Sequence, residues 1–385
     1  MSKKIVGVDL RCLPADGSDG AGVAHAARAL CERLASNVKC QTSNVGLRFY
    51  VPKGASWDLG EIVSLPDATG GSLRKALRDK SCDLLFVPGG SIAPALNVPT
   101  IPWVHDLIIF EHPEFFDQSW LQRRITTYLF KKGLKRAPAI LAVSEYTKSQ
   151  IVKLLKIDSR KIIVTYEGGD TSITNHQPTT QKLRGLKLPI TNYKKEAKQF
   201  CERELGLTRD FVLCLGTVEP RKNVAMLMRA WKTAKRKSAN APDLVVAGAN
   251  GWKFEDVEEE IKNLTAIESQ FFHRYKSLTE DQKRTLLLAA TMVMVPSLDE
   301  GFGLVALEAM QAGTPVAVSD AGALPEVVGE AGMVIDAKDE ESWASAFLTC
   351  VTDDMACKLR SEMGFKQADN FSWEKSADIV YQTLK

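Results

Sequence analysis

Short runs of apolar and β-branched residues alternate along the chain with longer segments in which apolar positions recur at helical spacing. This alternation is typical of βαβ units, in which helices join parallel strands. The runs predicted to be strands are residues 4–10, 47–51, 83–87, 100–104, 139–143 and 161–166 in the first half, and 211–216, 243–248, 291–296, 314–319 and 332–336 in the second. The pattern therefore predicts an α/β protein with two doubly wound parallel sheets.

A polar, proline-containing segment separates the two series of strands. Residues 171–195 show little periodicity, and we place a linker region at 171–200. The predicted domains are then 1–170 and 201–370, followed by a helical segment at 371–385. A length of 385 residues agrees with about two domains.

Doubly wound domains bind their ligands at the carboxyl ends of the parallel strands. Two such domains joined by a linker are expected to face each other across a cleft. We therefore expect the functional residues in loops that directly follow strands.

Two of these loops belong to the N-terminal domain. Gly17, Gly20 and Gly22 follow the first strand and precede an alanine-rich helix, where glycines let a ligand approach the backbone. Their spacing is not G-x-G-x-x-G, so a nicotinamide-type site is not indicated. His105 and Asp106 follow a later strand, and the histidine either contacts a ligand or is satisfied by Asp106 or by the backbone.

Two further loops lead into helices. Ser144 opens the segment SEYTKSQIVKLL and is predicted to cap its helix, while Glu145 and Tyr146 are expected to face the cleft. Arg221 and Lys222 lie in TVEPRKN just before another helix. Two cations at a helix N-terminus are unfavourable for the helix itself, and this placement favours binding of a diphosphate.

The stretch DEGFGLVALEAM places Glu300 in a loop and Glu308 in the helix that follows. The backbone N–H groups of Gly301, Phe302 and Gly303 lie between them in sequence. Because a carboxylate accepts hydrogen bonds from pairs of hydroxyls, the two glutamates are predicted to hold a sugar and a ribose. Glu308 stands in an otherwise apolar helix and is therefore predicted to have a partner.

The composition describes an ordinary globular chain, with 45% hydrophobic and 25% charged residues and a net charge of +3. No secretory signal and no apolar run of membrane-spanning length is apparent, so a cytoplasmic protein is expected. The eight cysteines are scattered without a C-x-x-C pair, which favours reduced thiols over disulfides or a zinc site. The sequence contains no D-x-D pair for a divalent ion, and we expect no metal.

A basic segment spans residues 118–161, with eleven basic residues against two acidic ones. Trp120, Tyr128 and Phe130 are interleaved with this charge. The combination favours contact with an anionic membrane surface, and a solvated helix face is an equally weighted alternative. Nucleic acid is not expected, because no nucleic-acid-binding motif accompanies the charge.

Taken together, the motifs resemble those of the retaining GT-B glycosyltransferases related to glycogen synthases and bacterial mannosyltransferases. The resemblance rests on VHDL, VSEYT, GTVEPRKN, ALPEVVG and the E-G-F-G-L-x-x-x-E element, and it runs over nearly the whole chain. It implies two Rossmann-like domains facing each other across a cleft. The N-terminal domain would bind the acceptor, the C-terminal domain would bind a nucleotide sugar, and the C-terminal helix would cross back to the first domain.

The resemblance also implies roles for residues of the C-terminal domain. Glu308 is assigned to the ribose hydroxyls and Glu300 to hydroxyls of the donor sugar, while Arg221 and Lys222 neutralise the diphosphate. The residues whose backbone N–H groups contact the sugar or phosphate are Gly301, Phe302, Gly303 and Leu304.

In the N-terminal domain the resemblance places His105 near the primary hydroxyl of the sugar and Gly20 and Gly22 beside the reaction centre. His105, Arg221, Lys222 and Glu300 thereby become the predicted catalytic residues. Asp106, Ser144, Glu145 and Tyr146 become acceptor or cleft contacts. Many relatives carry an arginine where this chain has Thr217, which puts additional weight on Arg221.

The implied reaction is glycosyl transfer with retention at the anomeric carbon, without a cofactor, a metal or a protein nucleophile. Similarity to bacterial mannosyltransferases favours GDP-mannose as donor and a glycan or polyprenyl-linked acceptor in polysaccharide or O-antigen synthesis at the inner face of the cell membrane. A UDP-sugar donor such as UDP-glucose is the main alternative. A non-hydrolysing sugar-nucleotide epimerase and an exported solute-binding receptor are the competing hypotheses from other classes.

Overall fold

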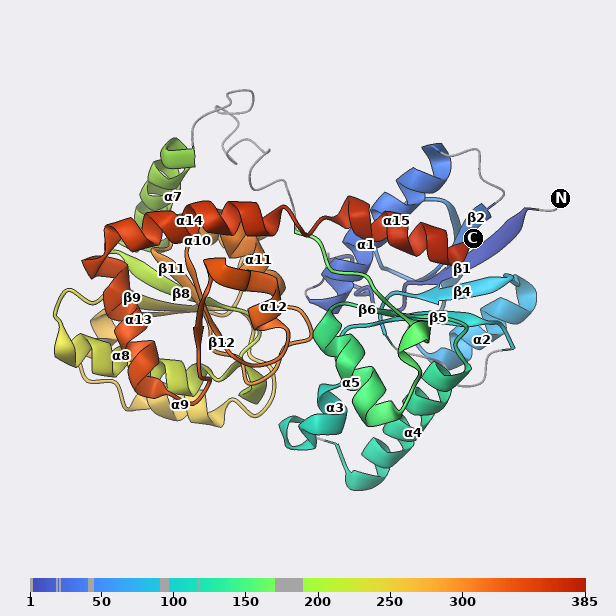
Figure 1. The fold of residues 1–385 in the computed structure, drawn as a ribbon, viewed down its shortest axis with the longest axis horizontal. Helices are drawn as coiled ribbons and strands as arrows, with labels where there is room; N and C mark the ends of the chain where they lie inside the picture. The colour runs from blue at the N-terminus through green and yellow to red at the C-terminus, as the bar shows by residue number, and fades with distance from the viewer. Residues whose placement is uncertain are drawn as a thin grey trace. The chain divides into compact units, whose positions relative to one another are not determined.

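The computed structural model describes residues 3–18, 20, 22–40, 45–90, 97–116, 118–169 and 190–385. The chain forms two compact units (Figure 1). Unit 1 comprises Met1–Pro113, Gln118–Gly168 and Phe371–Lys385, and unit 2 comprises Glu114–Asp117 and Gly169–Asn370. The C-terminal residues therefore belong to the same unit as the N-terminal half of the chain.

Unit 1 contains a parallel sheet in the strand order β3-β2-β1-β4-β5-β6-β7. Its strands are β1 Lys4–Asp9, β2 Val45–Pro52, β3 Glu61–Leu65, β4 Leu84–Val87, β5 Thr100–Val104, β6 Ile140–Ala142 and β7 Ile162–Val164. Its helices are α1 Val23–Cys40, α2 Gly70–Asp79, α3 Ile108–Glu111, α4 Trp120–Arg136, α5 Glu145–Leu155 and α15 Trp373–Leu384. Helices α1 and α15 lie on one face of the sheet and α5 on the other (Figure 1).

Unit 2 contains a second parallel sheet in the order β10-β9-β8-β11-β12-β13. Its strands are β8 Phe211–Leu215, β9 Asp243–Ala247, β10 Phe272–Tyr275, β11 Met292–Val295, β12 Val316–Ser319 and β13 Met333–Ile335. Its helices are α7 Ile190–Leu205, α8 Val224–Lys237, α9 Glu255–Lys262, α10 Glu280–Ala289, α11 Leu304–Gln311, α12 Leu324–Val328, α13 Glu340–Thr352 and α14 Asp354–Ala368. Helices α10, α11 and α14 cover one face, and α8, α9 and α13 cover the other (Figure 1).

The prediction of two doubly wound parallel α/β domains is confirmed by these two sheets. All eleven predicted strands are present, and each sheet has one further strand at its edge, β3 in unit 1 and β10 in unit 2.

Helix α7 begins at Ile190, inside the stretch 171–200 where the sequence predicts a linker region. The helix is amphipathic, and Ala197 and Cys201, one turn apart, are both buried. It packs against α10, so residues 190–200 belong to the folded part of unit 2. Residues 171–189 of the predicted linker lie outside the described residues.

Large aromatic side chains fix α15 to unit 1. Trp373 at its first position is 1% exposed and meets Trp103 of β5 edge to face, with ring centroids 6.4 Å apart. The hydroxyl of Ser376 donates to the carbonyl oxygen of Tyr166 at 2.5 Å. Because aromatic burial and an internal hydrogen bond both stabilise this contact, α15 is an integral part of the unit 1 core.

Among the described residues, no helix has both the length and the apolar character needed to cross a bilayer. The cysteines whose state the structure gives, Cys12, Cys31, Cys82, Cys201, Cys214 and Cys357, are free thiols. Burial raises the pKa of Cys214 to about 12, so this thiol is neutral and unreactive near pH 7.

Candidate active site

The strand order of unit 2 reverses between β8 and β11, which is where an open α/β sheet binds its ligands. The loops that leave these two strands are joined by a backbone hydrogen bond from Leu298 N to the carbonyl oxygen of Arg221, at 2.7 Å. The predicted residues Arg221, Lys222 and Glu300 all lie in these loops and are in direct contact.

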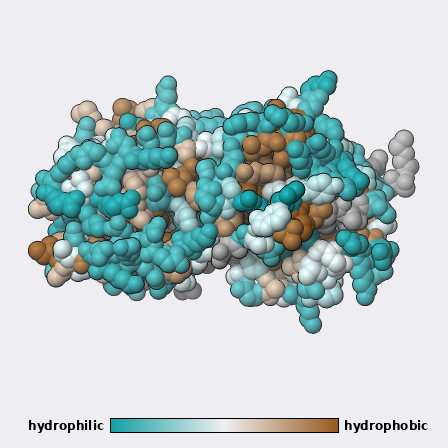
Figure 2. Space-filling model, turned by 90° about the horizontal axis from the view of Figure 1, so that it is seen from below, coloured by the Kyte–Doolittle hydropathy of each residue, from teal (hydrophilic) through white to brown (hydrophobic). Residues whose placement is uncertain are grey.

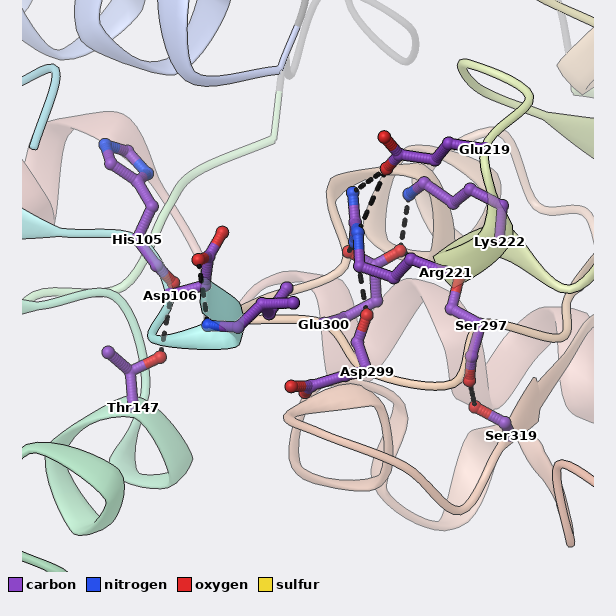
Figure 3. Close-up of polar contacts among 11 residues, drawn as sticks. His105, Asp106, Thr147, Glu219, Arg221, Lys222, Ser297, Asp299, Glu300 and Ser319 are labelled. Atoms are coloured by element: carbon purple, nitrogen blue, oxygen red, sulfur yellow. Dashed lines mark hydrogen bonds and ion pairs between the residues drawn. The ribbon is translucent and has the colours of Figure 1, made fainter. Parts of the chain in front are cut away.

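The carboxylate of Glu300 is the centre of this cluster (Figure 3). Its Oε2 accepts a hydrogen bond from Arg221 Nη1 at 2.5 Å, and its Oε1 accepts from Lys222 Nζ at 2.5 Å and from Ser297 Oγ at 2.8 Å. Arg221 also donates to Glu219 Oε1, from Nη2 at 2.7 Å and from Nε at 3.0 Å. Two cations and two carboxylates thus form one connected network at the switch point.

The electrostatics of this network keep Glu300 ionised. Burial would raise the pKa of Glu300, but the charges of Arg221 and Lys222, with hydrogen bonds from Lys222 and Ser297, lower it to about 2. The carboxylate is therefore an acceptor of hydrogen bonds throughout the physiological pH range.

Glycines shape the backbone around Glu300. Gly303 has φ +116°, and a Cβ there would lie 2.7 Å from Leu324 Cδ2. A Cβ at Gly322 would lie 2.4 Å from the carbonyl oxygen of Glu300, which accepts a hydrogen bond from Ala323 N at 2.8 Å. The loop can therefore fold tightly back on α12 only with glycine at both positions.

Helix α11 begins at Leu304, directly after this loop, without a side-chain cap on its first turn. Its N-terminus thus carries the positive end of the helix dipole toward the loop that follows β11. The phenyl ring of Phe302 is buried at 3% exposure, so this residue presents backbone rather than side chain.

Glu308 is buried at 6% exposure, one turn into α11. Its Oε1 accepts a hydrogen bond from Lys283 Nζ of α10 at 2.7 Å. Its Oε2 is buried and has no hydrogen-bond partner among the described residues. The partner that the sequence predicts for this acid is therefore Lys283, and one carboxylate oxygen remains available as an acceptor.

Asn223 lies directly before α8, but it has φ +53° and makes no side-chain cap hydrogen bond to that helix. Its Nδ2 donates instead to the carbonyl oxygens of Pro296 and Ala337, at 3.2 and 2.9 Å. Asn223 therefore ties the loop after β8 to the loop after β11.

In unit 1 the strand order reverses between β1 and β4. Gly20 and Gly22 precede α1 with φ +73° and +53°, and nothing lies within 4 Å of a Cβ added at Gly22. A cavity of about 200 Å³ is lined by the strand-following residues Gly90, His105 and Asp106, and by Thr126 of α4. This end of unit 1 is thus open and has an exposed carboxylate, that of Asp106.

His105 lines this cavity but uses both ring nitrogens inside the unit. Nδ1 lies 2.8 Å from Glu167 Oε1, and Nε2 lies 2.7 Å from the carbonyl oxygen of Pro88. Burial would lower the pKa of His105, but the hydrogen bond and charge of Glu167, with the Pro88 carbonyl, raise it. Because both partners accept hydrogen bonds, the ring carries a proton on each nitrogen and is positively charged.

The remaining N-terminal candidates follow β6. Ser144 is fully buried, and its hydroxyl accepts from Thr147 N at 2.9 Å, which confirms the predicted cap of α5 and leaves the side chain no exposed surface. Glu145 is exposed beside Lys148, at 3.6 Å. The hydroxyl of Tyr146 donates to Glu111 Oε2 at 3.4 Å.

Sequence reasoning assigned no role to several residues of these clusters, namely Glu167, Glu219, Lys283 and Ser297. Glu167 follows the predicted strand at 161–166, so the strand-following rule applied to that loop would have found it. Glu219 and Ser297 lie in loops that were already singled out. Lys283 gives no local signal, because it sits in a polar helical turn far from Glu308 in sequence.

Family models match both halves of the chain. Residues 22–173 match the model described as Glycosyltransferase Family 4, and residues 196–368 match the model described as Glycosyl transferases group 1. The O-antigen chain mannosyltransferase B of Escherichia coli is 30% identical over 311 residues, which is 80% of this chain and 76% of that protein.

Solved structures share the fold over nearly their whole length. Sucrose-phosphate synthase from Thermosynechococcus elongatus superposes with a TM-score of 0.74 at 18% identity, covering 99% of this chain and 98% of the other. Anabaena HepE in complex with UDP-glucose superposes with a TM-score of 0.68 at 17% identity, covering 99% of each chain. The chain belongs to the family 4, group 1 glycosyltransferases, and its fold is the GT-B fold of that family.

Proposed function

We propose that the protein is a retaining glycosyltransferase that binds a nucleotide sugar in unit 2 and transfers the sugar to a glycan or lipid-linked acceptor in polysaccharide or O-antigen synthesis. The observation that carries this proposal is the cluster in which Arg221 and Lys222 share the carboxylate of Glu300 at the switch point. Such a cluster offers cations to a diphosphate and a carboxylate to sugar hydroxyls in the same place.

Donor binding would exchange partners within this cluster. Arg221 and Lys222 are 20% and 18% exposed, so phosphate oxygens can reach both of them. As the phosphates take over the cations, Glu300 is released to accept hydrogen bonds from hydroxyls of the donor sugar. Glu219 keeps Arg221 in place during the exchange through its two hydrogen bonds.

The ribose would be held by Glu308. Its unpartnered, buried Oε2 needs a hydrogen-bond donor, since a buried unpaired acceptor is costly. A ribose hydroxyl supplies that donor, and this supports the role that the resemblance gives to Glu308.

In the proposed reaction the bond between the anomeric carbon and the diphosphate oxygen breaks, and the acceptor oxygen bonds to the anomeric carbon from the same face. The acceptor proton passes to the departing phosphate oxygen. Arg221, Lys222 and the N-terminus of α11 stabilise the negative charge on the diphosphate as it leaves. The proposal thus requires neither a metal nor a covalent intermediate.

For the donor we propose GDP-mannose, supported by the name of the E. coli O-antigen chain mannosyltransferase, to which this chain is 30% identical. UDP-glucose is the second candidate, because a solved structure with the same fold contains it. Glu300 and Glu308 contact features common to both donors and so do not separate them.

The experiment has two stages. A thermal-shift screen of the wild-type protein against GDP, UDP and ADP identifies the nucleotide, because a ligand that binds the folded state raises the unfolding temperature. The matching nucleotide sugar is then incubated with and without acceptor glycans, and NMR of the product reports the anomeric configuration. An inverted product contradicts retention. Conversion of the donor to an epimer without any acceptor contradicts the transferase proposal.

We further propose that α4 contacts an anionic membrane that carries the acceptor. Its apolar side chains Trp120, Leu121, Ile125 and Tyr128 are 62, 55, 51 and 62% exposed. The guanidinium of Arg124 lies 5.5 Å from the ring of Trp120, and Lys132 lies 5.7 Å from the ring of Tyr128. Figure 2 is seen from below the view of Figure 1, the side on which α4 lies, and shows hydrophobic and hydrophilic surface next to each other on unit 1. Apolar and basic residues on one exposed helix suit the lipid interface.

Replacement of Lys131, Lys132, Lys135 and Arg136 by glutamine tests this contact. Each basic residue near an anionic surface contributes about 1 kcal/mol, so we expect loss of all four to weaken binding to phosphatidylglycerol vesicles by about 1000-fold. A control variant carries glutamine at four exposed lysines of unit 2, Lys262, Lys276, Lys358 and Lys366. Equal sedimentation of the two variants with the vesicles would contradict membrane contact and would favour the interpretation of α4 as a solvated helix face.

A further inference from the structure

Lys283 has no assigned role in glycosyl transfer, yet it holds one of the two glutamates of the proposed donor site. Its Nζ lies 2.7 Å from Glu308 Oε1 and 3.9 Å from Glu280 Oε2. The Lys283 side chain is 23% exposed, whereas that of Glu308 is 8% exposed. The lysine therefore reaches inward from the surface of α10 to a buried acid on α11.

The position of Lys283 near the start of its helix makes carboxylate partners favourable. Helix α10 begins at Glu280 with a capping box formed by Thr279 and Gln282, so Lys283 lies in its first turns. A cation there is repelled by the positive end of the helix dipole. The ion pair with Glu308 and the longer contact with Glu280 offset this repulsion, and the shorter of the two is the one with Glu308.

Lys283 also makes the two oxygens of the Glu308 carboxylate differ in their contacts. Oε1 is engaged by the ammonium, while Oε2 is buried and has no hydrogen-bond partner within the part of the chain that the structure describes. Among the residues that the structure describes, Lys283 is the side chain recorded as donating to this carboxylate. The ammonium thus fixes the plane of the carboxylate and determines which oxygen is presented as an acceptor.

We propose that Lys283 is a positioning residue for the donor: it orients Glu308 so that Oε2 receives the ribose hydroxyls of the nucleotide sugar. The inference rests on the proposed donor site. Lys283 acts through Glu308, so it contributes to donor affinity and does not take part in the glycosyl transfer step. A ribose bound to Glu308 is held less well once the carboxylate is free to turn.

The test compares Lys283→Met, which keeps the length and removes the charge, with Lys283→Arg, which keeps the charge. Lys276→Met is the matched control, because Lys276 is an exposed lysine in the loop just before α10. GDP and UDP are the probes, each beside its 2′,3′-dideoxy analogue, and calorimetry gives the dissociation constants. Circular dichroism and the unfolding temperature verify that each variant is folded.

We expect Lys283→Met to raise the dissociation constant of the bound nucleotide and the KM of its sugar by about 10-fold, the usual effect of losing a charge-assisted hydrogen bond. The kcat at saturating donor stays within about twofold of wild type, and Lys283→Arg restores most of the affinity. With the dideoxy analogue, wild type and Lys283→Met bind equally well, because no ribose hydroxyl is left for Glu308 to hold.

Three results would overturn the inference: equal behaviour of Lys283→Met and Lys276→Met, a loss of affinity that persists with the dideoxy analogue, or no restoration by a folded Lys283→Arg. Glu308→Gln separates this failure from failure of the donor site itself. If Glu308→Gln leaves nucleotide affinity unchanged, the proposed donor site is wrong. If Glu308→Gln weakens binding and Lys283→Met does not, the donor site stands and the positioning role is wrong.

Discussion

The two units have the same doubly wound topology, but they use positive charge differently at the ends of their strands. In unit 2 the cations of Arg221 and Lys222 are about one fifth exposed and share a carboxylate. In unit 1 the imidazolium of His105 is 10% exposed and Glu167 is 7% exposed, and both ring nitrogens are engaged. The first arrangement can exchange its partners with a ligand, whereas the second is fixed within the fold.

The two ion pairs therefore differ in whether a ligand can reach their cations. In unit 2 the Glu300 carboxylate is buried, but its two cations are partly exposed, so ligand oxygens can compete with the carboxylate for them. A buried pair strongly resists loss of one member, because the other charge is left without compensation. We therefore expect substitutions of the unit 2 cations to act mainly on catalysis, and those in the unit 1 pair to act on stability.

The largest expected effect is on turnover, from Lys222→Ala. Loss of a cation that stabilises the leaving diphosphate should lower kcat by about 100- to 1000-fold. The unfolding temperature should change less than kcat, because Arg221 and Ser297 still donate to the Glu300 carboxylate. Steady-state kinetics with saturating donor and acceptor measure the effect, and Arg236→Ala at the far end of α8 is the control. A kcat within threefold of the control would contradict a role for Lys222 in stabilising the leaving diphosphate.

Substitutions of Glu308 and Glu300 should affect different quantities, nucleotide affinity for Glu308 and kcat for Glu300. Glu308→Ala removes the proposed ribose acceptor and should raise the nucleotide dissociation constant by about 10- to 100-fold. Glu300→Ala should leave nucleotide affinity closer to wild type and mainly lower kcat, because Glu300 contacts the sugar. Calorimetry with the nucleoside diphosphate, beside kinetics with its sugar, distinguishes the two variants. Identical profiles would contradict the division of roles.

Much of this comparison could be predicted from sequence, because the relevant residues follow strands. Buried parallel strands are apolar throughout, so β8 and β11 are recognisable, and the loops after them carry Arg221, Lys222 and Glu300. The edge strands β3 and β10 were not predicted, because they are less buried and are not apolar throughout. Residues of β3 are largely exposed and those of β10 are half-buried, and neither strand shows a continuous apolar run.

Contacts between distant segments could not be predicted. The pairing of Lys283 with Glu308 depends on how α10 packs beside α11, and that of His105 with Glu167 depends on the proximity of the ends of β5 and β7. The sequence also suggested that Arg221 and Lys222 await a polyanion, whereas Glu219 and Glu300 already pair with them. Residue types and spacing identify a charged loop, but its partners emerge only in the folded sheet.

Unit 1 should show a pH dependence of stability that unit 2 does not share. The pKa of His105 is raised in the folded state, so its contribution to stability is fully present below its unfolded value, about 6.5, and is lost as the pH rises through the folded value. The pKa of Glu300 is about 2, so it contributes no slope near neutral pH. Hydrogen exchange of β5 and β6 amides, with β8 amides as an internal reference, measures the difference.

The matched variant for this pH dependence is Glu167→Gln, which keeps the shape and removes the charge. It should abolish most of the slope above about pH 6.5 in unit 1 while leaving the β8 amides unchanged, because the raised pKa of His105 depends on the carboxylate. An unaltered slope in this variant would mean that another group titrates, and that His105 is not held as an imidazolium by Glu167.

The smallest expected effect compares the starts of two helices that follow strands. Ser144 accepts a hydrogen bond from Thr147 N, so Ser144→Ala should destabilise unit 1 by about 1 kcal/mol, seen as faster exchange in α5. Asn223 does not cap α8, and its Nδ2 joins the loops that carry Lys222 and Glu300. Asn223→Ala should therefore lower kcat severalfold with little loss of α8 protection. If Asn223→Ala instead loosened α8 and spared kcat, the link between the two loops would be unimportant for the cluster, and the asymmetry between the units would rest on the ion pairs.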